Sequence, residues 1–170
     1  MNRREFIKGT AWMGAAVAAA GCMGAGRNLA DATGAPMHGF REKPKKRIRV
    51  GIAGIGCRGN DAVHRLSGIP GIEVAAVCDV EPVRLDLCCD WLAKHGKPAP
   101  KRFVGTEAYK AMCEWDGVDV VYNTTPWQLH AAVGLYALRS GKHSMVEVPA
   151  AMTLDECWEF VETAEKYRLH

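Results

Sequence analysis

The sequence predicts an α/β fold with a doubly wound parallel sheet over residues 47–170. Three observations predict it: short apolar strand patterns alternate with helical patterns, glycines fill the first strand-to-helix turn, and the connections are short. Strands joined through helices form right-handed parallel crossovers, so one sheet should hold all of them. The chain of 170 residues, 48% of them hydrophobic, suits a single globular domain of this kind.

Five strands are expected, separated by helices. The strand patterns cover residues 48–52, 73–78, 102–104, 118–123 and 143–146. The helical patterns between them cover residues 61–66, 82–95, 107–114 and 125–140. Thr125 is expected to cap the fourth of these helices, with Pro126 at its first position and Gly141 as its stop. Thr153 and Glu156 have the spacing of a capping box, which predicts a final helix running toward residue 168.

The first 22 residues resemble a bacterial twin-arginine export signal. Arg3 and Arg4 precede Phe-Ile-Lys and an apolar stretch from Ala11 to Cys22, which is shorter than the ~20 residues that cross a bilayer as a helix. The alternative is a fortuitous amphipathic N-terminus. Such a signal implies a periplasmic or other extracytoplasmic location. Ala-Gly before Cys22 also resembles a lipoprotein cleavage site, so a lipid on Cys22 is the one membrane attachment that the sequence leaves open.

Residues 23–46 are expected to form a linker between this signal and the domain at residues 47–170. They are rich in Gly, Ala, Asn, Asp and Pro and show no apolar periodicity. The basic run at residues 43–47 is interpreted as a solvated junction.

Charge and cysteine patterns argue against two kinds of site. The chain has 22 Lys and Arg against 19 Asp and Glu, and the excess is concentrated in the export signal. The near-neutral remainder gives no electrostatic reason to expect nucleic acid as a partner. The seven cysteines include no Cys-x-x-Cys and no zinc-like Cys/His spacing, so no metal is expected and the thiols should be mostly free and packed.

The turn after the first strand has the pattern Gly-x-Gly-x-x-Gly, formed by Gly54, Gly56 and Gly59. The pattern alone is weak in a chain with 18 glycines, but here a strand precedes it and a helix follows it. Gly54 would permit the tight turn, Gly56 would let the backbone approach a pyrophosphate, and Gly59 would let the helix pack close to the sheet. The helix N-terminus would then bind the phosphates of a dinucleotide.

Asp79 ends the second strand, about 20 residues past the last glycine of the turn, where an acid binds the adenosine ribose in this kind of site. Its carboxylate would repel a 2′-phosphate, which favours NAD over NADP. The alternative role for Asp79 is a helix cap. Arg58 lies at the phosphate turn, and its alternative is a solvated side chain.

Further motifs identify the family that this sequence resembles. They are the glycine turn, then Cys-Asp-Val at residues 78–80, Asn-Thr-Thr-Pro-Trp-Gln-Leu-His at residues 123–130 and Gly-Lys-His-Ser-Met-Val-Glu-Val-Pro at residues 141–149. Together they resemble the Gfo/Idh/MocA family of sugar oxidoreductases over residues 47–170. Thr125, Pro126 and His130 match the family's Thr-Pro-x-x-x-His. Val148 replaces the lysine of its Glu-Lys-Pro, and a valine can neither carry charge nor move a proton.

Within that group the chain is most similar to glycoside hydrolase family 109, which includes NAD-dependent α-N-acetylgalactosaminidases. The similarity rests on residues 56–59, 127–130 and 147–153 and on the leader. It implies NAD contacts at Cys57, Arg58, Asp79, Trp127, Gln128, Leu129, His130, Glu147 and Val148.

Physical chemistry suggests a role, and an alternative, for three of these side chains. Trp127 would pack against nicotinamide or ribose, or it is a core ring. His130 would hydrogen-bond the cofactor, or it is a core or surface histidine. Glu147 would bind ribose or substrate, or it is a helix cap or structural acid.

The resemblance also implies a reaction. NAD⁺ takes a hydride from C3 of the sugar, the proton on C2 is removed, the aglycone leaves C1, water adds and the hydride returns, so that NAD is not consumed. The family's sugar pocket and catalytic residues lie in a second α/β domain, here expected beyond residue 170, so no catalytic residue is assigned and this polypeptide alone should be inactive. The alternatives are part of an exported NAD-dependent sugar oxidoreductase and a non-catalytic nucleotide-binding module.

Overall fold

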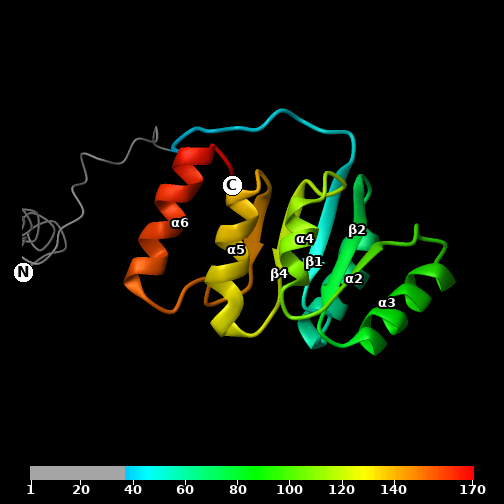
Figure 1. Cartoon of the computed structure of the whole chain (residues 1–170). Coiled ribbons are helices and arrows are strands. Elements are labelled where there is room, and N and C mark those ends of the chain that lie inside the picture. Colours follow the sequence, from blue (N-terminus) through cyan, green and yellow to red (C-terminus); the bar gives the residue numbers. More distant parts are fainter. Residues whose placement is uncertain (1–36) are drawn as a thin grey trace, which may run out of the picture. The chain divides into compact units, whose positions relative to one another are not determined.

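Five parallel strands form the sheet at the centre of this chain, whose computed structural model describes residues 37–170 (Figure 1). The strand order is β3-β2-β1-β4-β5, so the first strand is central, with β2 and β3 on one side of it and β4 and β5 on the other. The strands are β1 (Ile48–Ala53), β2 (Ile72–Asp79), β3 (Lys101–Val104), β4 (Val120–Asn123) and β5 (His143–Val146). This arrangement confirms the predicted doubly wound parallel sheet.

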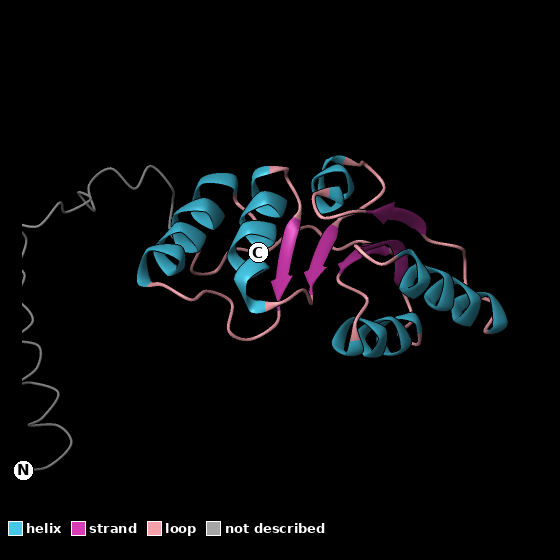
Figure 2. Cartoon of the chain, turned by 60° about the horizontal axis from the view of Figure 1, so that its bottom comes forward, coloured by secondary structure: helices cyan, strands magenta, loops and turns pink. Residues whose placement is uncertain are grey.

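Helices cover both faces of the sheet (Figure 2). Apolar side chains of α2 (Cys57–Ser67) and α3 (Pro82–Lys94) pack with β1 and β2 into one buried cluster. Side chains of α4 (Ala108–Glu114) and α5 (His130–Arg139) form a second cluster with the other face. The last helix, α6 (Leu154–Tyr167), packs beside α5. No helix within residues 37–170 combines the length and apolarity needed to cross a membrane.

The predicted strands and most of the helices are found within a few residues of their expected ends. The helix α2 begins at Cys57, earlier than the 61–66 pattern, because Gly56 already occupies its N-cap position. The capping box at α6 is confirmed: the Thr153 hydroxyl accepts a hydrogen bond from the Glu156 N–H, and the Glu156 carboxylate accepts one from the Thr153 N–H.

The helix predicted over residues 125–140 is found at residues 127–139, but its first turn is a 3-10 helix and the expected start and cap at Thr125 and Pro126 are wrong. The Thr125 hydroxyl donates to the side-chain oxygen of Asn123 at 2.7 Å, so it does not cap a helix. Pro126 precedes a short 3-10 helix, η2 (Trp127–Leu129), and α5 begins only at His130. A competing side chain within the same turn therefore changes the start of this helix.

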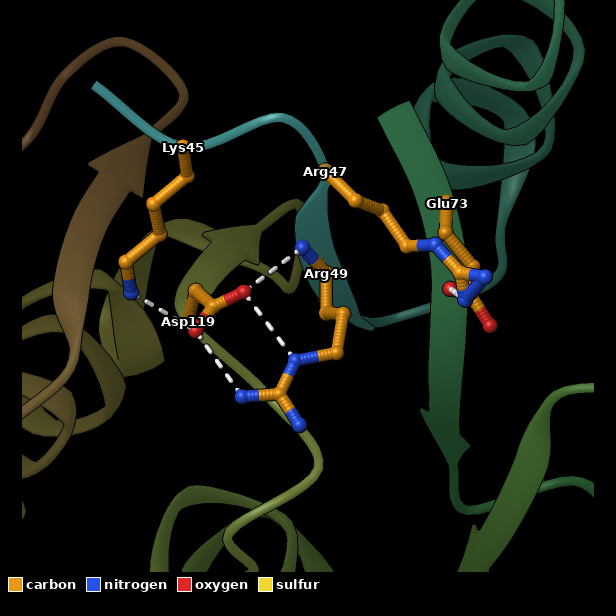
Figure 3. Close-up of polar contacts among 5 residues, drawn as sticks. All are labelled: Lys45, Arg47, Arg49, Glu73 and Asp119. Atoms are coloured by element: carbon orange, nitrogen blue, oxygen red, sulfur yellow. Dashed lines mark hydrogen bonds and ion pairs between the residues drawn. The ribbon is translucent and has the colours of Figure 1, made fainter. Parts of the chain in front are cut away.

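Charged side chains attach the segment that leads into β1 to the neighbouring strands (Figure 3). The Asp119 carboxylate accepts hydrogen bonds from the Arg49 backbone N–H at 2.9 Å, from the Arg49 guanidinium at 2.9 and 3.1 Å, and from Lys45 at 3.0 Å. The hydrogen bonds from Arg49 hold the pKa of Asp119 well below its ordinary value. Arg47 pairs with Glu73 at 2.8 Å.

Residues 37–46 contain no helix or strand, as expected for the end of the predicted linker. They are nevertheless attached to the domain. Besides the Lys45 pair, the ring of Phe40 lies 4.8 Å from that of His170. All residues of the basic run at 43–47 are exposed, as expected of a solvated junction, and Lys45 and Arg47 also form surface ion pairs with the domain. The export signal and the remainder of the predicted linker lie outside the described residues.

Candidate cofactor site

The three glycines of the first turn are required for different geometric reasons. Gly54 has a φ of +87°, and an added Cβ would lie 2.9 Å from the Thr124 carbonyl oxygen. A Cβ on Gly59 would lie only 1.8 Å from the carbonyl oxygen of Gly54, so α2 approaches the turn at a distance that only glycine permits. A Cβ on Gly56 would meet nothing nearer than an Arg84 nitrogen at 3.7 Å. Gly56 therefore borders open space, as the approach of a ligand would require.

The turn is held from both neighbouring strands. The Gly54 N–H donates to the Cys78 carbonyl at the end of β2, at 2.7 Å. From the end of β4, the Thr124 hydroxyl lies 2.6 Å from the Gly54 carbonyl oxygen and 3.0 Å from that of Ala53. Thr124 belongs to the quoted family motif, but sequence reasoning gave it no role.

The N-terminus of α2 is available to an anion. No side chain caps this helix, and its first turn contains no acidic residue. Cys57 and Arg58 are exposed there, while Gly59 is buried. Since the first N–H groups of a helix have no partner within it and carry the positive end of its dipole, this end can bind phosphate oxygens.

Asp79 lies beside the turn, but its carboxylate already has partners. Its side chain is 4% exposed. One oxygen accepts the Ile55 N–H at 2.6 Å, and the other accepts the Glu81 N–H at 2.9 Å, just before α3. The residue thus joins the turn to α3, close to the alternative capping role. A carboxylate can accept about four hydrogen bonds, so contact with ribose hydroxyls is compatible with these two.

Arg84 is a residue that sequence reasoning missed. Its guanidinium is 3.7 Å from the Asp79 carboxylate and borders the open space at Gly56. The sequence could have indicated Arg84, because it lies in the first turn of the helix that follows Asp79.

The segment after β4 presents three exposed side chains. Trp127, Gln128 and Leu129 form η2, and the Trp127 side chain is 59% exposed. The alternative of a core ring is therefore excluded for Trp127. An exposed indole at this place can pack against a flat ligand.

His130, by contrast, is 1% exposed. Its Nδ1 lies 2.7 Å from the Pro149 carbonyl oxygen, and its Nε2 lies 2.8 Å from the Thr125 carbonyl oxygen. Both ring nitrogens thus face backbone oxygens of the chain, and a neutral ring, with its one N–H, donates to one of them. This geometry favours the alternative of a core histidine, and a hydrogen bond from the ring to a cofactor stays a prediction.

The segment after β5 holds Glu147 and Val148. Tyr122, on β4, donates its hydroxyl hydrogen bond to the Glu147 carboxylate, and burial is the main cause that raises the pKa of Tyr122. Glu147 is therefore partnered as a structural acid would be. Val148 is 81% exposed.

These groups meet at one edge because all five strands are parallel. The glycine turn follows β1, Asp79 ends β2, and the segments at residues 124–130 and 147–149 follow β4 and β5. A surface groove lined by residues 67–74, Lys46 and Lys97 lies at the start of β2, at the opposite edge, and takes no part in the site. Residues 37–170 hold no group of three or more His, Cys, Asp or Glu side chains placed to bind a metal ion.

A glycine turn beneath an uncapped helix at the carboxyl edge of a doubly wound sheet defines a dinucleotide-binding domain of the Rossmann type. Residues 48–169 match the family model described as the Gfo/Idh/MocA oxidoreductase family, NAD-binding Rossmann fold, and the chain belongs to this family. The family confirms the resemblance inferred from the motifs and the prediction of NAD as cofactor.

Within this family, the chain is similar to proteins named as glycosidases. The chain is 46% identical over 124 residues to a glycosyl hydrolase family 109 protein of Porphyromonas gingivalis, covering 72% of this chain and 26% of that protein. It is 38% identical over 132 residues to an alpha-N-acetylgalactosaminidase of Bacteroides fragilis, covering 78% and 31%. The chain thus spans less than a third of the length of these two relatives.

Among solved structures, the WlbA dehydrogenase of Chromobacterium violaceum, in complex with NADH and UDP-GlcNAcA, superposes with a TM-score of 0.63 at 25% identity. The match covers 75% of this chain and 35% of that one.

Proposed function

We propose that this chain is the NAD-binding portion of an exported glycosidase that hydrolyses glycosides, N-acetylgalactosaminides in particular, by NAD-dependent oxidation, elimination, addition and reduction. Its relatives named glycosyl hydrolase family 109 proteins and alpha-N-acetylgalactosaminidase support the substrate class. Val148, at the position of the oxidoreductase lysine, supports a departure from ordinary dehydrogenase chemistry.

The observation that carries the cofactor site is the open position of Gly56 at the uncapped N-terminus of α2. A pyrophosphate placed there would meet backbone N–H groups, the helix dipole and the exposed Arg58. Asp79 would accept ribose hydroxyls with its remaining lone pairs, and Trp127 would cover a ring of the cofactor. NAD supplies a hydride acceptor that is regenerated within each turnover.

Gly56→Ala tests this site because it should separate binding from folding. The backbone of Gly56, with φ −76°, accepts alanine, and the new methyl group meets no protein atom within 3.4 Å. We expect the urea midpoint to stay unchanged while calorimetry shows at least a tenfold loss of NAD affinity. Gly68→Ala, at the C-terminal end of the same helix, is the matched control and should leave the NAD affinity unchanged and the urea midpoint unchanged or slightly higher. No heat on titrating the folded parent chain with NAD would refute the site.

A sugar oxidoreductase is the second candidate, favoured by the 25% identity to the WlbA dehydrogenase. Assays of a longer version of the protein that includes the region following residue 170 in its relatives would separate the two. Release of p-nitrophenol from an α-N-acetylgalactosaminide without net NADH supports the glycosidase. Sustained accumulation of NADH with a free sugar supports the oxidoreductase.

Export rests on Arg3 and Arg4, and we propose the twin-arginine pathway with a periplasmic or other extracytoplasmic destination. Replacing both arginines with lysine should retain the protein in the cytoplasm of a twin-arginine-competent host. Metabolic labelling with a fatty acid, compared between the parent and Cys22→Ser, decides whether Cys22 is lipidated.

A further inference from the structure

The buried ring of His130 joins two segments that are far apart in the sequence. Its two nitrogens face the carbonyl oxygens of Thr125 and Pro149 at 2.8 and 2.7 Å. Thr125 leads into the exposed η2, which carries Trp127, and Pro149 directly follows the exposed Val148. One side chain thus connects the loops that follow β4 and β5.

The backbone that carries the ring is held by a buried asparagine. Asn123, at the end of β4, is fully buried, and its side-chain N–H₂ donates to the His130 carbonyl at 3.1 Å. Its side-chain oxygen accepts the Thr125 N–H at 3.1 Å. The start of α5 and the first loop are therefore fixed to the sheet, which makes His130 a rigid base for the second loop. The loop at residues 147–151 forms no helix or strand of its own.

We propose that His130 is a positioning residue, which sets the loop at residues 147–151 against η2 so that both face one cofactor. This inference rests on the proposed function, because it assumes that both loops contact NAD. The imidazole acts through the two backbone carbonyls and does not touch the cofactor. An imidazole suits the role because its two nitrogens lie on two sides of one ring: a neutral ring donates its single N–H to one of the two carbonyl oxygens, and only an imidazolium donates to both.

The test compares hydrogen exchange and NAD affinity in variants of the full chain. His130→Phe fills the same space without nitrogens, and we expect amide exchange in residues 125–129 and 147–151 to rise together by about tenfold, with a similar loss of NAD affinity. His130→Gln retains a donor and should restore part of both. Val133→Ala removes a buried side chain from the same helix. It should lower the urea midpoint without loosening the second loop or weakening NAD binding.

Each outcome decides between the explanations. Unchanged exchange at residues 147–151 in the folded His130→Phe variant would overturn the proposal, and so would equal loosening in Val133→Ala. If His130→Phe does not fold, the same comparison is made with His130→Gln. If the parent binds no NAD but the two loops still loosen together, His130 couples the loops and only the proposed function fails.

Discussion

Replacing Gly59 with alanine tests whether close packing of α2 on the glycine turn stabilises the domain. The ideal Cβ position lies 1.8 Å from the carbonyl oxygen of Gly54 and 2.8 Å from the Thr124 hydroxyl. Carbon–oxygen contacts between packed backbones are normally at least about 3.3 Å. The first turn of α2 would therefore have to retreat by ~1.5 Å, and the group it meets is backbone that cannot rotate away.

The expected loss follows from two opposing effects. Forcing a methyl group into a packed site costs about 1–3 kcal/mol, and a fixed backbone oxygen places this site at the upper end. Alanine gains about 1 kcal/mol over glycine inside a helix. We therefore expect the free energy of unfolding to fall by ~2 kcal/mol, which is a large share of the 5–15 kcal/mol typical of a domain.

Urea denaturation of the Gly59→Ala and Gly68→Ala variants measures this difference with the same substitution at both ends of α2. A Cβ at Gly68 meets only the carbonyl oxygens of Arg65 at 3.5 Å and His64 at 3.9 Å, which are ordinary contacts. Gly68→Ala should be neutral or slightly stabilising. Unfolding free energies of the two variants within 0.5 kcal/mol of each other, an interval set by the usual scatter of surface substitutions, would refute the packing argument.

Two further predictions concern titratable groups. Because its folded-state pKa is lowered, Asp119 should stabilise the domain above the unfolded pKa near 4 and lose that stabilisation as pH falls toward the folded value. Urea titrations should thus show Asp119→Asn less stable than the parent by ~2 kcal/mol at pH 7, a difference that shrinks below pH ~4. Equal stability of variant and parent at both pH values would contradict this. Asp61→Asn, at an exposed residue, is the control. The exposed Cys57 should react with a thiol reagent in the native chain. Burial raises the pKa of three other thiols to about 12, and these should react only after unfolding: Cys78, Cys88 and Cys113. Mass spectrometry that finds these three labelled in the native chain would contradict their burial.

Local patterns were enough to predict the fold. Apolar alternation follows directly from burial, and parallel connection then places every strand's carboxyl end at one edge. Gly54 and Gly59 have the surroundings expected of a tight turn and of close helix packing, with a φ of +87° at Gly54 and a Cβ position 1.8 Å from the Gly54 carbonyl oxygen at Gly59. The approach of a pyrophosphate to Gly56 stays a prediction.

Side chains with several possible partners could not be assigned in this way. Thr125 has the residue type and place of a cap, but Asn123 takes its hydroxyl. His130 is of a residue type that can bind a cofactor, but its ring nitrogens face two carbonyl oxygens of the chain. In both cases the deciding partner is a matter of three-dimensional placement, since several polar groups within reach compete for one donor or acceptor.

The acid next to Val148 does not replace the lysine of the family motif. The neighbouring acid, Glu147, is already hydrogen-bonded to Tyr122, so it is not a free base beside the exposed valine. A lysine at residue 148 would have placed a cation and proton donor at the cofactor edge, and valine removes that function without offering another. Under the proposed function, the described residues therefore bind and orient NAD, and we expect the groups that move protons on the sugar to lie outside residues 37–170.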